Sequence, residues 1–240
     1  MVYEWEGGKK AEELNQLWQV YVKNISGFFT ECSDKFKDKK RGRRAKHVKK
    51  TCAYNLLKRL KANTKSKIYT FNYTNPYEYV DMPQVKDLTH LHGVYNKDTF
   101  NKPLMVMSQG HNIIFGIDEC IPDDGTNNPY IHPLVKIYHP EYKDTDMVSD
   151  LSNAENVIFY GFSMGVIDYR YFAEFFNATN NRCKKIYYVT YNKKGFKDFL
   201  NNFKRNNCDI DNILQQKTII PIYTRNGLKN RDFRLMLRRL

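Results

Sequence analysis

From residue 156 to the end of the chain, short apolar runs alternate with longer amphipathic runs. The apolar runs 156–160, 185–191 and 218–223 are rich in β-branched and aromatic residues, which is typical of buried strands. The runs 168–179, 195–205 and 229–239 have the apolar spacing of helices. Strands that alternate with helices usually pair in parallel, with helices covering the sheet. We therefore expect an α/β fold, with a Rossmann-like, mostly parallel sheet and helices on both faces.

The first two thirds of the chain are less regular. Apolar spacing predicts helices over 9–31 and 51–60 and short strands over 67–71 and 88–92, with a hairpin from 104–107 and 112–115. Residues 122–150 contain several prolines and predict a loop-rich insertion with one helix near 134–138. The pattern predicts two regions, a helical N-terminal region over 1–66 and an α/β domain over 67–240.

The net charge of +13 is concentrated in one segment. Residues 35–67 hold 15 Lys or Arg and one acid, Asp38, so the rest of the chain has a net charge of −1. The basic segment 35–50 can contact the phosphate backbone of a nucleic acid or another acidic partner, or it can be a solvated loop between helices. Phe36 is its one aromatic residue, so the segment offers no stacking platform for single-stranded bases.

Composition argues against several classes of protein. No apolar run of about 18 residues occurs, and the N-terminal residues lack the features of a signal peptide. The five cysteines are scattered and form no C-x-x-C pair, so neither a structural zinc site nor a disulfide framework is expected. We expect a reduced, cytoplasmic protein that does not contact a membrane.

Two fragments in the middle of the chain carry polar groups at predicted strand ends. Asn72 follows one strand, and its amide suits ribose hydroxyls or a positioned water, although asparagine is also common in turns. His90 and His92 would share one face of the next strand. Two histidines on one face can bind a metal with further ligands, whereas one histidine at a strand end can act as a general base.

The stretch from Gly161 to Asp168 joins a predicted strand to a predicted helix. Its G-x-S-x-G pattern occurs in the nucleophile elbow of α/β-hydrolases, but that triad needs a histidine downstream of Ser163. No histidine follows His139, so a serine-hydrolase triad is rejected. The helix start would suit phosphate or ribose oxygens, and Asp168 is also a natural helix cap.

Taken together, and in this order, four fragments resemble the bacteriophage abortive infection protein AbiH family. The fragments are Tyr69 to Thr74, His90 to Gly93, Ile113 to Asp118, and Gly161 to Asp168 with the following 169–176. The resemblance covers roughly residue 67 to the C-terminus and implies an antiphage function. The family in turn looks like a distant branch of sirtuin-like, Rossmann-type proteins that bind NAD, and antiphage members of that group often hydrolyse NAD.

The resemblance implies roles for particular residues. Asn72 and His92 would be the catalytic asparagine and histidine of an NAD glycohydrolase. Gly161, Ser163, Asp168 and Thr74 would bind the nucleotide, with NAD as the substrate and no metal. The alternative is a non-catalytic module that senses a nucleotide or a nucleic acid, the latter through residues 35–50.

One motif of the family is missing from this sequence. AbiH proteins usually begin with a strand and a Gly-Asn-Gly-Phe-Asp-type motif that cradles phosphates, and no such motif occurs in this chain. We therefore expect a sheet that is incomplete at its N-terminus. The chain would then be a truncated remnant, or it would be completed by a partner chain that supplies the missing unit.

Overall fold

The structure is a computed structural model that describes residues 48–72, 88–92, 146–169, 171–178, 181–183, 185–205 and 210–240. The chain divides into a first unit, Met1–Ala45 with Lys67–Lys143, and a second unit, Lys46–Ser66 with Asp144–Leu240. The predicted helices over 9–31 and near 134–138, the predicted hairpin and most of the basic segment lie outside the described residues.

The described part of the first unit is a pair of short parallel strands. Strand β1 spans Ile68–Thr70 and β2 spans Leu88–His90. Their register pairs Ile68 with Leu88 and Thr70 with His90. Both strands lie where the sequence predicts them, and each is shorter than its predicted range.

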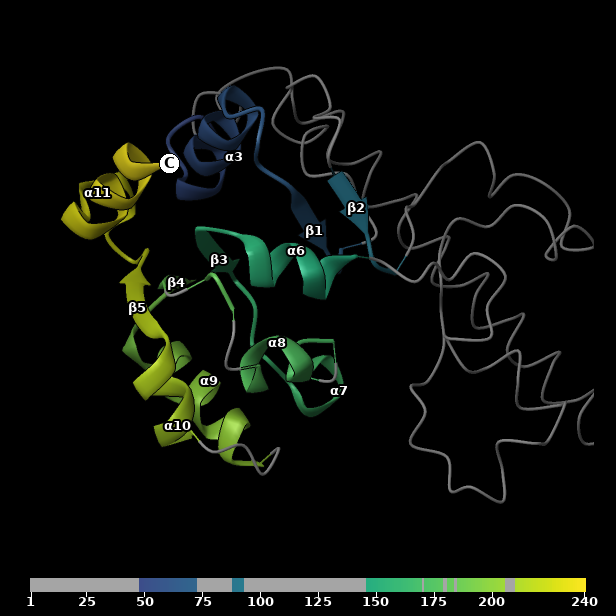
Figure 1. The fold of residues 1–240 in the computed structure, drawn as a ribbon. Coiled ribbons are helices and arrows are strands. Elements are labelled where there is room, and N and C mark those ends of the chain that lie inside the picture. Colours follow the sequence, from purple (N-terminus) through teal and green to yellow (C-terminus); the bar gives the residue numbers. More distant parts are fainter. Residues whose placement is uncertain are drawn as a thin grey trace, which may run out of the picture. The chain divides into compact units, whose positions relative to one another are not determined.

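The second unit contains a three-stranded parallel sheet in the order β3-β4-β5 (Figure 1). The strands span Asn156–Tyr160, Lys185–Thr190 and Thr218–Tyr223. Both pairings are parallel, with Asn156 opposite Lys185 and Lys185 opposite Thr218. These positions agree with the predicted strands to within one residue.

Four helices form the connections between these strands and lie on one face of the sheet. They are α7 (Val166–Tyr169), α8 (Ala173–Asn177), α9 (Lys193–Arg205) and α10 (Ile210–Gln216). Their core is aromatic: the Tyr188 ring stacks on Phe199 with centroids 3.9 Å apart, and Phe176 meets Phe203 edge-on at 4.7 Å. Burial of these large rings is the main force that holds the connections to the sheet.

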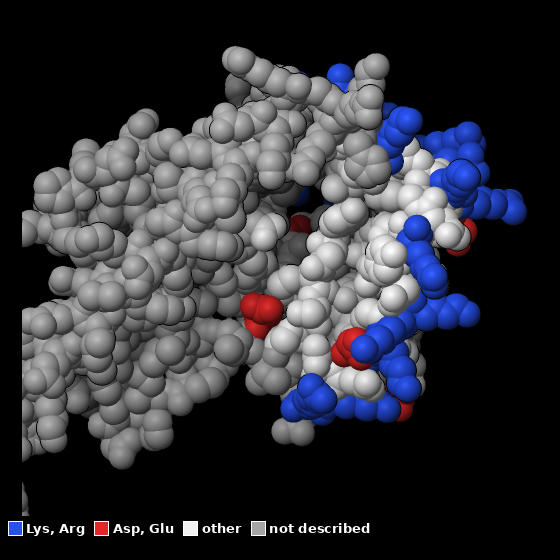
Figure 2. All heavy atoms as spheres, turned by 180° about the vertical axis from the view of Figure 1, so that it is seen from behind, with Lys and Arg blue, Asp and Glu red and all other residues white. Residues whose placement is uncertain are grey.

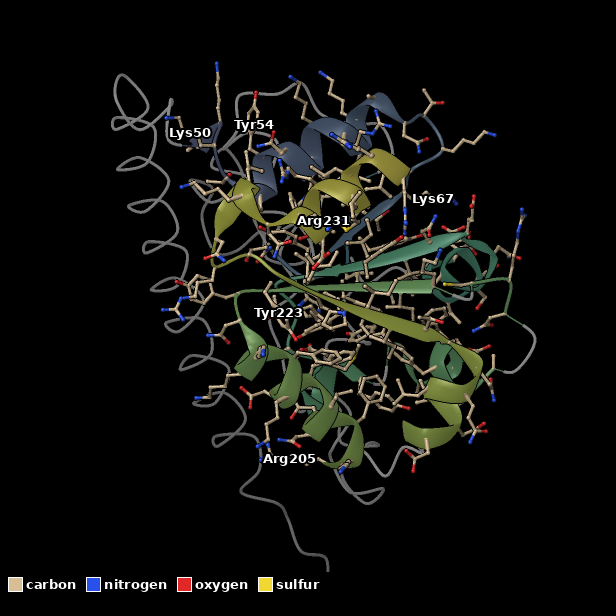
Figure 3. All side chains as sticks on the ribbon, turned by 90° about the vertical axis from the view of Figure 1, so that its left-hand side faces the viewer. Lys50, Tyr54, Lys67, Arg205, Tyr223 and Arg231 are labelled. Atoms are coloured by element: carbon tan, nitrogen blue, oxygen red, sulfur yellow. The ribbon has the colours of Figure 1, made fainter. Side chains whose placement is uncertain are left out.

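Two further helices cover the opposite face of the same sheet (Figure 3). Helix α3 spans Cys52–Ala62, and α11 spans Arg231–Arg239 after the 3₁₀ turn η4, Gly227–Lys229. Tyr187 and Val189 of β4 share a buried cluster with Leu56 of α3 and Phe233 of α11. Because neighbouring strand residues point to opposite faces, Tyr187 and Tyr188 serve the two separate cores.

Helix α3 is close to its predicted range of 51–60. It begins after Thr51, whose Oγ1 accepts a hydrogen bond from the Tyr54 N–H at 3.2 Å. This cap satisfies one of the unpaired N–H groups of the first turn. Since α3 packs in the second unit, the last part of the predicted N-terminal region lies on the C-terminal sheet. The rest of that region is outside the described residues, so the predicted division at 66/67 stays a prediction.

The helices differ from the sequence-based expectations in three places. The single helix expected over 168–179 is two helices, because Tyr171 and Phe172 donate three residues back, to the Asp168 O at 3.2 Å and the Tyr169 O at 2.8 Å. Such 3₁₀-type bonds interrupt an α-helix. Helix α6, Met147–Asn153, begins inside the expected loop-rich insertion. Helix α10 was not expected from the sequence; of its side chains over 211–216, Ile213 is the buried one.

The fold confirms the α/β class with parallel strands and helices on both faces of a sheet, and it is consistent with a Rossmann-like domain. In the part of the chain that the structure describes, no helix is long and apolar enough to span a bilayer.

Candidate functional site

The first unit brings Asn72 and His92 to the same edge of the β1–β2 pair. The two strands are parallel, and Thr70 lies opposite His90. Asn72 and His92 each follow two residues later, so both leave the pair at its carboxyl edge. Ligands of open α/β sheets bind outside this edge. Two residues that are 20 positions apart in the sequence are thereby placed at one edge.

The backbone of Asn72 is held on both sides, whereas its side chain is exposed. Its N–H donates to the Thr70 Oγ1 at 3.1 Å, and its carbonyl oxygen lies 2.9 Å from the Nδ1 of His90. Because a carbonyl oxygen only accepts, Nδ1 carries the proton in this contact. His90 therefore positions Asn72, and the exposed amide is available to meet a ligand.

His92 lies in a more enclosed place than Asn72. It is 8% exposed, and the Phe71 ring meets it edge-on with centroids 5.1 Å apart. The expectation that His90 and His92 share a strand face is wrong, because β2 ends at His90 and residues 91–92 form a turn. The Leu91 N–H donates to the Thr70 O at 2.9 Å, and this bond is made where the chain leaves the strand. The described residues contain no group of three or more potential metal ligands.

In the second unit, the connection from Gly161 to Gly165 follows β3 and has an unusual backbone. Gly161 has a φ of +63°, which suits glycine, and its N–H donates to the Val189 O at 2.9 Å. Met164 has a φ of +54°, which costs a residue with a side chain about 1 kcal/mol. The Met164 side chain is fully buried, so its packing offsets this cost.

Two side chains from other elements hold this connection in place. The Tyr188 hydroxyl donates to the Phe162 carbonyl oxygen at 2.5 Å, and the Asn202 Nδ2 donates to the Ser163 carbonyl oxygen at 2.8 Å. Ser163 itself is exposed. The connection is thus fixed to β4 and α9 through its carbonyls, while the serine points away from the core.

The sequence predicted that Asp168 could cap the following helix, but Asp168 does not lie at the N-cap position. It is the third residue of α7, which begins at Val166 and has only four residues. Its Oδ2 lies 3.5 Å from where a Cβ on Gly165 would stand, so the carboxylate turns back toward the connection. A helix of one turn has little macrodipole with which to attract phosphate. Thr74 lies outside the described residues, and the nucleotide-binding roles of Gly161, Ser163, Asp168 and Thr74 stay predictions.

The model of the family described as "Bacteriophage abortive infection AbiH" matches residues 4–190, which is more than three quarters of the chain. The chain belongs to the AbiH family. Membership makes it a protein of abortive infection, a form of antiphage defence. Comparison with curated proteins and with solved structures found no match.

The match differs in extent from the resemblance found in the sequence. In this AbiH protein it begins at residue 4, well before residue 67, and it ends at 190, the last residue of β4. The matched range therefore includes the β1–β2 edge with Asn72 and His92, and also the connection that follows β3. The segment with α9, α10, β5 and α11 lies beyond the match.

Residues that sequence reasoning missed are those that hold the candidate site in place. His90 was weighed as a metal ligand or base, yet its ring bonds to the backbone of Asn72. Tyr188 and Asn202 were not singled out, although they hold the connection after β3. The continuous apolar run 185–191 marks Tyr188 as buried, but nothing in the spacing reveals which carbonyl its hydroxyl meets.

The Tyr188 hydrogen bond predicts a pH-dependent stability. Burial, with a smaller effect of the Asp198 charge, raises the pKa of Tyr188 from 10.0 to about 12. Between these values the folded protein keeps a proton that the unfolded chain releases, so the Tyr188 contribution to stability falls as the pH rises from 10 toward 12. Below pH 10, Tyr188→Phe should cost about 1 kcal/mol, and this difference should shrink by pH 11.

Urea unfolding of both proteins at pH 9 and pH 11 measures this change. Tyr191→Phe, which alters a residue that is 64% exposed, is the matched control. An equal difference between wild type and Tyr188→Phe at the two pH values would show that the Tyr188 proton is not linked to folding.

Proposed function

We propose that this AbiH protein acts in antiphage defence by hydrolysing NAD at the edge that carries Asn72 and His92. The observation that supports the proposal is their placement together after two neighbouring parallel strands. The exposed amide of Asn72 can bond to ribose hydroxyls or to the attacking water. The imidazole of His92 can accept a proton near neutral pH, as a general base does.

The reaction needs few groups from the protein. The oxygen of water forms a bond to C1′ of the ribose as the bond from C1′ to the nicotinamide nitrogen breaks. The bonding electron pair leaves with nicotinamide, which becomes neutral, and one proton of the water passes to His92. The products are ADP-ribose, nicotinamide and one proton. No acid is needed at the leaving nitrogen, and the charge on the ribose in the transition state resembles that of glycoside cleavage.

Positioning is the main contribution expected of Asn72. Its backbone is held by Thr70 and His90 through bonds of 3.1 and 2.9 Å, so the position of the amide is set before a ligand arrives. A prearranged group avoids the entropic cost of ordering it during the reaction. Phe71, edge-on to His92, presents an apolar wall beside the imidazole.

Release of nicotinamide from NAD by the purified full chain tests the proposal. We expect release by the wild type and a loss of at least about 100-fold in Asn72→Ala and His92→Ala, the size typical of a lost general base or positioning group. Asn226→Ala is the matched control, since Asn226 is an exposed asparagine in the turn after β5. It should keep the wild-type rate.

The same experiment controls for misfolded variants and for a missing partner chain. Circular dichroism of each variant should match that of the wild type, so that a lost rate reflects the site. The assay is repeated with the products of the neighbouring genes, so that activity requiring a partner chain is also detected. Failure of the wild type to release nicotinamide in both settings, or full activity of His92→Ala, would refute NAD hydrolysis at this site.

A further inference from the structure

The net charge of the chain belongs to the second unit. Residues 46–66 and 144–240 contain 23 Lys or Arg and 10 Asp or Glu, a net of +13. The first unit contains 16 of each and is neutral. In the sequence, the positive charge is densest in residues 35–67. The second unit also contains a basic segment at its C-terminal end, residues 225–240.

The cations of the second unit are dense on α3, α11 and the turns next to them. The twelve cations of these segments are all exposed. Figure 2 shows Lys and Arg side chains along the outer rim of the described part, with few acids between them. The basic residues are Lys49, Lys50, Lys58, Arg59, Lys61 and Lys65 around α3, and Arg225, Lys229, Arg231, Arg234, Arg238 and Arg239 around α11. Asp232 is the one acid in these two segments, 48–66 and 225–240. We call this set the α3–α11 surface.

The two helices form one layer, so their outer sides belong to one surface. Each helix buries its apolar side in the same cluster, through Leu56 of α3 and Phe233 of α11. Their C-terminal ends meet where the Asn63 Nδ2 donates to the Leu240 carbonyl oxygen at 3.2 Å. In Figure 3 both helices lie on the same side of the sheet, with the Arg231 and Lys50 labels on that side.

The spacing in α11 aligns three arginines on its outer side. Arg231, Arg234 and Arg238 are three and four residues apart, which places them in one stripe. Phe233 and Met236 are buried on the inner side of the helix. The stripe covers seven residue steps, or about 10 Å of helix. One strand of a duplex presents about three phosphates over that length.

Helix stability explains only some of these cations. Arg59 and Lys61 of α3 and Arg238 and Arg239 of α11 lie in last turns, where a positive charge is favourable to the helix dipole. Lys50 just before α3 and Arg231 at the start of α11 lie at the unfavourable end. Positive charge that opposes helix stability indicates an anionic ligand.

We propose that the α3–α11 surface binds double-stranded nucleic acid through its phosphate backbone, without reading the bases. Arginine suits phosphate because its planar group can donate two parallel hydrogen bonds. Single-stranded binding is disfavoured, since the large hydrophobic residues exposed in the described part, Tyr160, Tyr191 and Leu214, are on neither helix. The lack of exposed apolar anchors on α3 and α11 equally disfavours a lipid surface. The proposal is independent of NAD hydrolysis.

The salt dependence of binding measures the number of phosphates contacted. A labelled 24-base-pair duplex of mixed sequence, as DNA and as RNA, is titrated with the full chain over a range of salt concentrations. Arg231→Gln/Arg234→Gln/Arg238→Gln keeps polar side chains of similar helix propensity while removing three charges. It should weaken binding at least about 10-fold near 0.1 M salt and reduce the log–log slope by about three.

The opposite face of the sheet offers a control of equal charge. Lys193, Lys197 and Lys204 are exposed on α9, which packs on β4 through Phe199 and Tyr188. Lys193→Gln/Lys197→Gln/Lys204→Gln should leave affinity within about 3-fold of wild type and the slope within about one. Thermal unfolding adds a second readout: Arg231→Gln alone should not lower the melting temperature, because it removes an unfavourable charge at a helix start.

Each result supports or overturns the proposal. Support requires wild-type duplex binding that is lost selectively in the α11 triple variant. The proposal is overturned by no duplex binding at low salt, by equal losses in the two triple variants, or by a clear preference for a single strand. It is also overturned if vesicles rich in phosphatidylserine bind through the same arginines while the duplex does not.

Discussion

Replacing Phe176 with alanine is expected to lower the free energy of unfolding by about 3–5 kcal/mol, the usual range for a buried phenylalanine. Phe176 is 1% exposed. Its ring lies 4.7 Å from that of Phe203, 5.0 Å from Phe175 and 5.9 Å from Phe159. It therefore joins α8, α9 and β3, and its loss opens a cavity where three elements meet.

Urea denaturation of the full chain, followed by far-UV circular dichroism, measures this loss. Tyr191→Ala is the control, because that aromatic side chain is 64% exposed and its removal should cost less than about 0.5 kcal/mol. Phe176→Leu should fall between the two, since it retains part of the buried volume. A cost below about 1 kcal/mol for Phe176→Ala would mean that this ring is not part of the core.

Replacing Lys217 is expected to give the second large loss of stability. Lys217 joins α10 to β5 in the sequence, and its charged side chain is buried. It is 2% exposed, and its Nζ donates to the Ala178 carbonyl oxygen at 3.1 Å and the Phe176 carbonyl oxygen at 3.4 Å. The amine also lies 5.6 Å from the centre of the Phe175 ring. These carbonyls belong to the end of α8, where a positive charge is favourable.

Lys217→Met should destabilise the protein by about 1–3 kcal/mol, because it keeps the apolar stem but leaves buried carbonyls without their donor. Lys217→Ala should destabilise the protein by at least about 1 kcal/mol more than Lys217→Met, since it also removes buried methylene groups. The exposed residue Lys229 provides the control, and Lys229→Met should have little effect. Equal stability of Lys217→Met and wild type would contradict the buried hydrogen bonds.

The strands of the second unit could be predicted because their residues leave few alternatives. Runs such as Asn156–Tyr160 and Thr218–Tyr223 are too short for a helix and rich in residues that favour strands. The break between α7 and α8 could not be predicted. Tyr169, Phe172 and Phe176 keep a helical spacing on both sides of it, and all three are buried.

The candidate site was only partly readable in the sequence. The resemblance to the AbiH family assigned Asn72 and His92 to one site, and the parallel pairing of β1 and β2 brings both residues to one edge. Which groups hold them depends on contacts between residues distant in the sequence, such as the His90 ring with the Asn72 carbonyl oxygen. The burial of Lys217 is another such case, because lysine is almost always exposed and spacing marks it as a surface residue.

The measurement that tests the account most directly is the NAD content of infected cells that carry the wild-type chain or His92→Ala. The assay includes Asn226→Ala as the control and confirms that all three proteins reach equal levels. We expect NAD to fall after infection, and phage yield with it, for wild type and Asn226→Ala, whereas His92→Ala should preserve both NAD and phage yield. Protection by the wild type with unchanged NAD, or equal protection by His92→Ala, would contradict the account.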